Sequence, residues 1–265
     1  MNRQRAPWLS RLEQVVGPTG PARSLGAGAY LLEAGGRALV AKLGDGRLDE
    51  ADGLRRLAQV PGAPSVPDVV LAEEGLLVTT AVAQARRAPG HDEDLGRSLA
   101  RLHRAPCAHW GGGSSWIGAC RVDPATWPDG AGFYGARLRA LASRCGLEEP
   151  VARVADRLAD LLPGGGPALV HGDLWWGNVL FGSDGRAWLI DPSVHGGHPE
   201  EDLAMLALFG PVPDRLRRAY DEERAPEAGW QTRVPLFQLY PLLVHAVLFG
   251  GGYRARAEAV CRRFA

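Results

Sequence analysis

The sequence has almost no lysine. Of its 30 basic residues, only Lys42 is a lysine, which leaves 29 arginines in 265 residues. An ammonium is a compact point charge and a guanidinium is a broad planar group, so the two do not fit the same sites. In a chain that otherwise uses arginine, the single lysine indicates a position that requires the compact cation. A chance occurrence is the alternative. We treat Lys42 as a candidate functional residue.

Cysteine is scarce too. The four cysteines contain no CxxC pair and form no Cys/His cluster with the spacing of metal ligands. This argues against a zinc site and against a disulfide framework. Isolated thiols are typical of a reducing compartment, so we expect a cytoplasmic protein.

A net charge and a long apolar run are also missing. The 30 acidic residues balance the 30 basic ones, which argues against nucleic-acid and membrane-surface partners and favours a small-molecule substrate. Residues 1–10 lack the apolar core of a signal peptide. The longest apolar stretch, 234–249, is interrupted by polar residues and prolines, so we expect a buried helix of a soluble protein with no membrane partner.

Two short stretches carry the chemistry: 171–178 (HGDLWWGN) and 189–192 (LIDP). They contain Asp173, Asn178 five positions later, and Asp191 eighteen positions after Asp173. Phosphoryl transfer needs a carboxylate near the substrate hydroxyl, and an amide and a second carboxylate to hold Mg²⁺ on ATP. A surface loop rich in turn formers is the alternative. We expect a β-hairpin around a turn at 183–185 to bring Asn178 and Asp191 together.

The N-terminal segment is predicted to form a glycine-cornered hairpin over residues 24–42. Gly26 and Gly28 at the corner would let backbone amides approach phosphate oxygens, and Lys42 on the partner strand would reach the α and β phosphates. Residues 49–57 form a predicted helix with Glu50 in its first turn. Glu50 is our candidate partner for Lys42; a solvated helix-start acid is the alternative.

We expect a lobe boundary near residue 81. Strands are predicted at 68–73 and 75–80, and no periodicity follows over 81–90. This divides the chain into an N-terminal nucleotide-binding lobe, 1–81, and a C-terminal catalytic and substrate-binding lobe, 82–265. The backbone of Thr79 and Ala81 would then meet the adenine edge.

Helical patterns dominate the second lobe. They cover residues 92–104, 133–145, 150–162, 202–209, 214–224, 232–249 and 253–264, whereas 106–130 is a loop by composition. His103 is expected to pack in the core. Asp202 is expected either to cap its own helix or to anchor the backbone of the catalytic stretch.

These residues resemble the fructosamine kinase (ketosamine kinase) family, which shares a superfamily with aminoglycoside and choline kinases. The stretch 170–178 is similar to the family's HGDLWxGN. The stretch 190–205 is similar to IDP…YYGHRExDLAM, and 133–138 and 238–253 also match family signatures. The likeness runs from about residue 24 to residue 253.

The resemblance implies an α+β, protein-kinase-like fold with a small antiparallel-sheet lobe and a larger helical lobe. It implies an ATP- and Mg²⁺-dependent enzyme that phosphorylates the 3-hydroxyl of a ketosamine, free or on protein lysines. Asp173 would be the catalytic base, Asn178 and Asp191 the metal ligands, and Lys42 and Glu50 the phosphate-side pair.

Trp175, Arg137 and His245 would lie on or near the sugar side. Trp175 is favoured because an indole can stack on the apolar face of a sugar, with buried packing as the alternative for Trp175 and His245.

Some positions depart from the family pattern. His195 and Gly196 stand where the family usually has two tyrosines, and Pro199 replaces an arginine; Arg121 and Asp123 replace Gln and Asn. These departures leave a kinase of another small alcohol, such as an aminoglycoside or choline-like compound, as the first alternative. The second is a catalytically silent nucleotide-binding module, whose hallmark would be loss of Lys42, Asp173, Asn178 or Asp191; all four are present. The sequence leaves the oligomeric state open.

Overall fold

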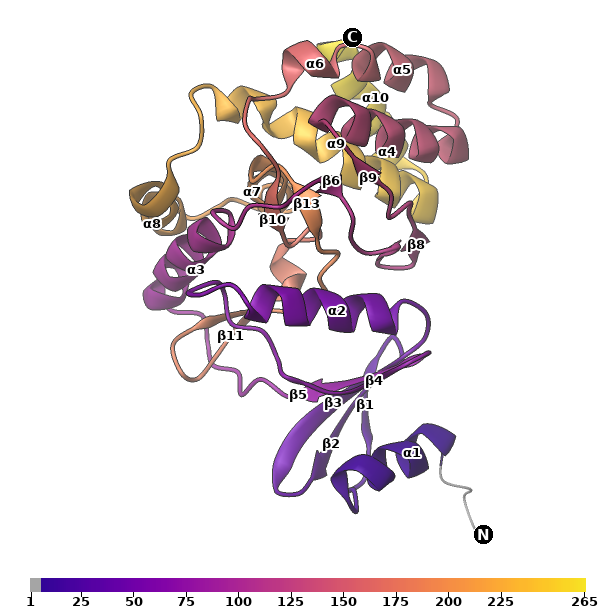
Figure 1. Cartoon of the computed structure of the whole chain (residues 1–265), viewed down its shortest axis with the longest axis vertical. Helices are drawn as coiled ribbons and strands as arrows, with labels where there is room; N and C mark the ends of the chain where they lie inside the picture. The colour runs from indigo at the N-terminus through magenta and orange to yellow at the C-terminus, as the bar shows by residue number, and fades with distance from the viewer. Residues whose placement is uncertain (1–5) are drawn as a thin grey trace.

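The computed structural model describes residues 6–265, so residues 1–5 of the N-terminal stretch considered above lie outside it. Helix α1 (Pro7–Val16) precedes a five-stranded antiparallel sheet in the order β1-β2-β3-β5-β4. Its strands are β1 (Arg23–Gly26), β2 (Ala29–Ala34), β3 (Arg37–Leu43), β4 (Val69–Glu73) and β5 (Leu76–Thr80). Helix α2 (Arg47–Ala58) lies between this sheet and the rest of the molecule (Figure 1). The predicted strands and the helix after Lys42 are confirmed.

The β2–β3 hairpin turns at Gly35 and Gly36. Ala34 pairs with Arg37, and Gly35 and Gly36 have φ values of 56° and 73°. Positive φ at both central residues is the geometry of a two-residue hairpin turn that matches strand twist. This register places Lys42 between Ala29 and Leu77 on the neighbouring strands.

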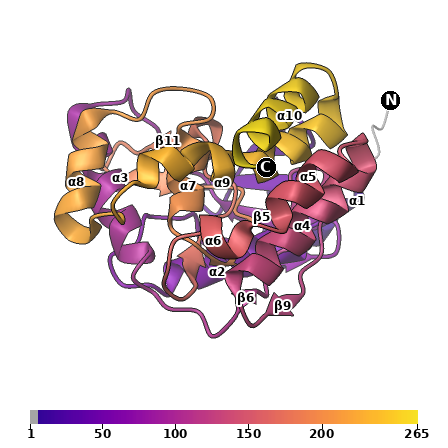
Figure 2. The ribbon, with the colours of Figure 1, turned by 90° about the horizontal axis from the view of Figure 1, so that it is seen from above.

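The remaining chain is mainly helical (Figures 1 and 2). Six of the predicted helices are present as α3 (Pro89–Leu102), α4 (Gly130–Cys145), α7 (Glu200–Leu206), α8 (Asp214–Arg224), α9 (Trp230–Phe249) and α10 (Gly252–Phe264). The predicted catalytic hairpin is also present, as β11 (Val179–Phe181) and β12 (Ala187–Leu189), which pair antiparallel after a single 3₁₀ turn, Trp176–Asn178. The expected α+β architecture is confirmed.

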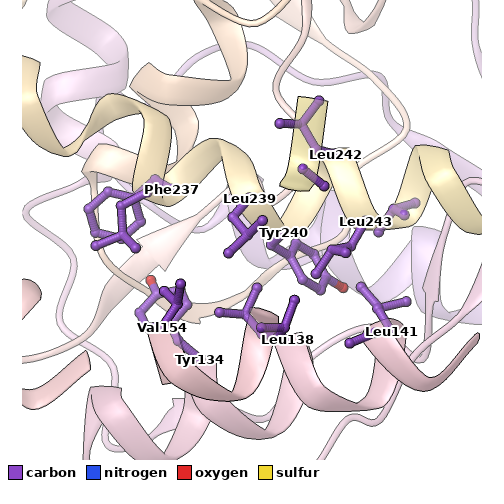
Figure 3. Packing of buried hydrophobic residues seen from close by; sticks show 14 of the residues in the cluster. Tyr134, Leu138, Leu141, Val154, Phe237, Leu239, Tyr240, Leu242 and Leu243 are labelled. Carbon is purple, nitrogen blue, oxygen red and sulfur yellow. The ribbon is translucent and has the colours of Figure 1, made fainter. Parts of the chain in front are cut away.

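Helix α9 is the centre of the largest apolar cluster. Its buried side chains meet those of α4 and α5 (Figure 3), including Tyr134, Leu138, Leu141, Val154, Phe237, Leu239, Tyr240, Leu242 and Leu243. Among the described residues, α9 is the one helix whose length and composition would also suit a membrane span. Its packing within this cluster agrees with the predicted buried helix.

The prediction of one helix over 150–162 is wrong. The segment forms α5 (Glu148–Ala155) and the short α6 (Leu158–Leu161), separated at residues 156–157. Val154 and Leu158 are both buried. Two short helices on one core thus reproduce the apolar spacing that suggested a continuous helix.

The prediction that 106–130 is a loop without regular structure is also wrong. It contains four two-residue strands, β6 (Trp110–Gly111), β7 (Trp116–Ile117), β8 (Cys120–Arg121) and β9 (Thr126–Trp127). A four-stranded sheet forms in the order β10-β13-β6-β9, where β10 is Ala168–Val170 and β13 is His195–Gly197. Two-residue strands whose partners are distant in sequence produce no local periodicity. The composition of 106–130 therefore predicted only a loop.

Candidate functional site

The catalytic stretch follows β10 and is held by a carboxylate from α7. Asp202 accepts hydrogen bonds from the backbone amides of His171 (2.8 Å) and Gly172 (3.0 Å). The N-cap of α7 is Pro199, with no side-chain cap. Of the two expectations for Asp202, the structure shows the anchoring role. Burial alone would raise the pKa of Asp202, but hydrogen bonds and charge interactions with His103 and His171 lower it.

Gly172 allows the sharp turn before Asp173. Its φ is 79°, and a Cβ at this position would lie 2.1 Å from the carbonyl oxygen of Ser193. A side chain is therefore excluded both by backbone conformation and by contact. The turn orients Asp173 toward the cavity described below.

Asp173 is half-buried and interacts with Asn178, the other predicted residue of the catalytic stretch. The Nδ2 of Asn178 donates to the Asp173 backbone oxygen at 2.8 Å and to its Oδ2 at 3.3 Å. Burial raises the pKa of Asp173 from its usual 3.8 to about 7, and the Asn178 hydrogen bond opposes that rise. A carboxylate with a pKa near 7 is well matched to accept a proton at neutral pH.

Lys42 meets acidic groups from both parts of the chain. Its Nζ lies 2.6 Å from Glu50 Oε1, so the expected Lys42–Glu50 pair is present, and it also contacts Asp191 Oδ1. Burial lowers the pKa of Lys42, while the negative charge of Glu50 opposes that shift. Lys42 does not face bulk water: its side chain is 16% exposed.

One cavity of about 240 Å³ brings together five of the predicted site residues. It is lined by Asp45, Gly46, Arg47, Glu50, Ser114, Trp116, Gly118, Asp173, Trp175, Asn178, Asp191 and Pro192. The hairpin brings Asn178 and Asp191 together, and the Ile190 amide donates to the backbone oxygen of Asn178 at 3.1 Å. Five of the twelve site residues named from sequence therefore line the same space.

The donor set of this cavity suits a hard cation that also binds phosphate. Within residues 6–265 there is no group of three or more His, Cys, Asp or Glu side chains placed to hold a metal by themselves. Mg²⁺ typically takes one or two carboxylates and completes its shell with water and substrate phosphates. Asn178 and Asp191 offer an amide oxygen and a carboxylate, with Asp191 at φ 54° and its side chain 45% exposed. These residues fit Mg²⁺ bound together with a nucleotide.

The residues predicted to contact the rest of the nucleotide are placed less favourably. Gly26 and Gly28 flank Ala27 in the β1–β2 turn, all three with positive φ, and they do not line the cavity around Asp173. Thr79 is paired with strands on both sides, and the Ala81 amide donates to the Ala38 oxygen at 2.9 Å. Because that amide already donates a hydrogen bond, only the carbonyl of Ala81 is left to meet the adenine edge.

Of the three residues predicted on the sugar side, one lines the cavity around Asp173 and two do not. Trp175 lines the cavity and is 39% exposed. His245 does not line it, but its ring lies 5.2 Å from Phe209, which contacts Trp175 at 6.0 Å between ring centroids. His245 is thus connected to the site through one aromatic neighbour.

Arg137 is not brought to the cavity. Its guanidinium lies 3.7 Å from the Tyr240 ring centroid, and its Nη1 is 3.0 Å from His195 Nε2. The guanidinium of Arg137 therefore packs against neighbouring side chains and does not line the cavity around Asp173.

Trp116 is the main site residue that we did not predict. It comes from the segment expected to be a plain loop, yet it lines the cavity with Trp175 and Asp173. The Gly, Pro and Trp content of that segment indicated a functional loop, but it did not single out one tryptophan. Asp45, Gly46 and Arg47 were also missed, since they precede the helix on which we considered Glu50.

Comparisons with known proteins agree with the site. The family model described as Fructosamine kinase matches residues 48–264. A "Probable ketoamine kinase" of Thermus thermophilus is 36% identical over 211 residues, covering 77% of this chain and 77% of that protein. A protein of the same description from Synechocystis is 36% identical over 186 residues, 64% of this chain but only 60% of that relative's length.

Solved structures extend the likeness to the whole chain. A structure from Thermobifida fusca that carries a provisional fructosamine-3-kinase name has a TM-score of 0.86 and 35% identity, with 97% of each chain covered. A streptomycin–ATP complex of the aminoglycoside phosphotransferase APH(2")-IIa has a TM-score of 0.66 at 16% identity, which shows the fold alone. The fold is therefore the expected two-lobed, kinase-like one. Because the family model spans most of the chain and the Thermus relative is matched over more than two thirds of it, the chain belongs to the fructosamine kinase family.

Proposed function

We propose that this protein transfers the γ-phosphoryl group of ATP to the 3-hydroxyl of a ketosamine, the adduct of a sugar and an amine. One observation carries the proposal: Asp173, Asn178, Asp191 and Trp175 line one cavity beside the Lys42–Glu50 pair. The family membership supports the acceptor class. The relatives' names refer to ketoamine kinases, and we extend that activity to this chain.

In the proposed reaction, the acceptor oxygen forms a bond to the γ-phosphorus as the bond to the β–γ bridging oxygen breaks, which releases ADP. The hydroxyl proton goes to a carboxylate oxygen of Asp173. Asn178 and Asp191 would hold Mg²⁺, which when bound neutralises charge on the phosphates. Lys42, fixed by Glu50, would contact the phosphates, and Trp175 would stack on the apolar face of the sugar.

The supporting physical argument concerns position and charge. A cavity that contains a half-buried carboxylate, with an ammonium fixed beside it, can align a hydroxyl and a phosphoryl group without a covalent enzyme intermediate. Free ketosamines and ketosamines on protein lysines are both proposed acceptors, in a cytoplasmic setting.

The test is the variant Asp173→Asn. We expect it to abolish phosphate transfer while MgATP binding, measured by calorimetry, stays close to that of the unmodified protein. Asp160→Asn, an exposed acid on α6, is the matched control and should retain full activity. Near-normal turnover by Asp173→Asn would contradict the assignment of the base.

An acceptor panel tests the substrate class. Fructosyl-lysine and a ribulosyl amine should be phosphorylated with higher kcat/KM than an aminoglycoside or choline. A preference for the last two would support the alternative acceptor, and phosphate transfer to none of them would favour a silent nucleotide-binding module.

A further inference from the structure

A second cavity, of about 390 Å³, adjoins the one that contains Asp173. The two share Asp45, Gly46, Arg47 and Trp116, and the second is completed by Leu48, Asp49, Glu74, Ser115 and Arg121. Trp116 and the 45–47 segment therefore form a common wall. A ligand bound at Asp173 would therefore lie close to this second space, with Trp116 between the two cavities.

Trp116 is fixed by contacts with both parts of the chain. Its backbone oxygen accepts from Ser193 Oγ at 2.9 Å, close to the catalytic stretch. Its ring lies against Gly46, where an added Cβ would be 2.9 Å from Trp116 Cγ. The neighbouring Ser115 amide donates to Asp49 Oδ2 of α2 at 2.7 Å. The indole is thus a fixed surface at the junction of the two cavities.

The charges of the second cavity divide into engaged and available groups. Arg47 is neutralised by Glu50 and also donates to the Asp45 backbone oxygen at 3.2 Å, while Asp49 accepts from Ser115. The carboxylates of Asp45 and Glu74 make no side-chain hydrogen bond or ion pair with any residue from 6 to 265. Both are exposed.

One cation also faces this space. The guanidinium of Arg121 lies 5.9 Å from the Trp116 ring centroid and makes no ion pair with the described residues. Two available carboxylates and one available guanidinium therefore line the same cavity as the indole. Such a set suits a ligand that carries an ammonium and, beyond it, a carboxylate.

We propose that this second cavity is the subsite for the amine half of the acceptor, and that Trp116 and Asp45 determine specificity by binding its ammonium. The inference rests on the proposed function. In a ketosamine the amine is bonded to C1 and the reacting hydroxyl is on C3, so the amine lies a few bonds from Asp173 when the sugar is on Trp175. A secondary amine is protonated at neutral pH and is attracted both to the indole face and to a carboxylate. The acceptor class is thereby narrowed to cationic adducts, with Arg121 placed for the carboxylate of an amino-acid substituent.

The test compares two acceptors that differ in charge at C1: fructosyl-glycine, which is cationic there, and 1-O-methyl-fructose, which is neutral. We expect Asp45→Asn and Trp116→Ala each to lower the ratio of their kcat/KM values by about tenfold, because each removes one attraction to the ammonium. Trp116→Phe should fall between the wild type and Trp116→Ala. Asp52→Asn, an exposed acid of α2 outside both cavities, is the control and should leave the ratio unchanged.

The outcomes separate the two proposals. If the wild type phosphorylates fructosyl-glycine but the variants lower kcat/KM for both acceptors by the same factor, the proposed subsite is wrong and the proposed function stands. If the wild type phosphorylates neither acceptor, the proposed function fails and the subsite with it. Thermal melting and the KM for ATP of each variant report separately on folding and on the nucleotide side.

Discussion

At the scale of single residues, Lys42 shows how one side chain links the two parts of the molecule. Its ammonium lies between Glu50 of α2 and Asp191 after β12, and its burial lowers its pKa. A buried cation is costly unless it is paired, so Glu50 both stabilises and orients the charge. Arginine at this position would add a planar fork to a space already occupied by two carboxylates.

The first residue-scale prediction concerns Glu50. We expect Glu50→Gln to lower kcat/KM for ATP by about ten- to a hundredfold, because the ammonium loses the carboxylate that fixes it. Asp52→Asn on the same helix should have little effect, because Asp52 is exposed and its ion pair with Arg56 is long, at 4.0 Å. Steady-state kinetics with varied ATP make the measurement. Equal kinetics for Glu50→Gln and the control would contradict a role for the pair.

The second concerns His198. Burial lowers its pKa from 6.5 to about 4, its Nδ1 accepts from the Glu200 amide at 3.2 Å, and its ring stacks on Phe237. The unfolded chain takes up a proton near pH 6.5 and the folded protein resists it until about pH 4. Stability from this group is thus present above pH 6.5 and is lost as the pH falls toward 4, by up to about 3 kcal/mol.

His198→Gln should flatten the loss of stability between pH 6.5 and 4, measured by urea unfolding at a series of pH values. A residual slope is expected from His171, whose pKa is also lowered by burial. The exposed His109→Gln variant should keep the full slope. An unchanged slope in His198→Gln would show that His198 is not held neutral.

The sequence predicted some of these residues better than others. Asp173, Asn178 and Lys42 could be named because each belongs to a pattern that one reaction requires. Trp116 could not, because its position depends on contacts with Gly46 and Ser193, which are 70 or more positions away in sequence. Arg137 was named from the resemblance alone, and its stacking on Tyr240 depends on the packing of α4 against α9.

At the scale of elements, three helices hold the catalytic stretch through one buried chain of hydrogen bonds. Tyr220 of α8 is 2.7 Å from Nδ1 of His103, at the end of α3, and His103 Nε2 is 3.1 Å from Asp202 of α7. Because the Asp202 carboxylate can only accept, Nε2 carries the ring proton and Nδ1 accepts from the Tyr220 hydroxyl. Asp202 in turn accepts from the amides of His171 and Gly172.

Tyr220→Phe tests this chain of contacts. Loss of the hydroxyl leaves a buried ring nitrogen without its donor, so we expect a destabilisation of about 1–3 kcal/mol. We also expect kcat to fall with little change in the KM for ATP, because Asp202 positions the turn before Asp173. Tyr253→Phe, on half-buried Tyr253 of α10, is the control. Urea unfolding and kinetics give the two readouts; a loss of stability with unchanged kcat would limit Tyr220 to a packing role.

Local periodicity was sufficient for most elements and insufficient where partners are distant. The α3 and α8 helices carry apolar residues at helical spacing, α9 is apolar along most of its length, and all three were predicted within a few residues. The β6–β9 strands have two residues each, and Gly113 in that segment lies so close to Val194 that an added Cβ would be 1.7 Å from its oxygen. Such close non-local contact explains why this segment is ordered, and it leaves no trace in the spacing of apolar residues.

At the scale of the whole molecule, the site depends on two parts of the chain. Glu50 and Arg47 come from α2, beside the five-stranded sheet, while Asp173, Trp175 and Asn178 come from the mainly helical part (Figure 1). The lobe boundary at residue 81 stays a prediction. The kinase-like architecture, in contrast, could be predicted from the order of the motifs along the chain. The hairpin with Lys42 comes first, the helix with Glu50 follows, and the stretches with Asp173 and Asp191 come last, as in the family that the chain resembles.

A ligand that contacts both parts should stabilise the folded chain as a whole. At a concentration 100 times its Kd, MgATP is expected to add about 2.7 kcal/mol and to raise Tm by about 5 °C. ATP with EDTA should give a smaller rise, because Asn178 and Asp191 then lose the cation that links them to the phosphates. Asp191→Asn should reduce the difference between the two conditions, whereas Asp160→Asn should preserve it. Equal Tm shifts with and without Mg²⁺ in the unmodified protein would contradict the metal site. Without Mg²⁺, the Asp191 carboxylate would face the phosphates with only the charge of Lys42 to offset their repulsion, so the nucleotide should bind more weakly.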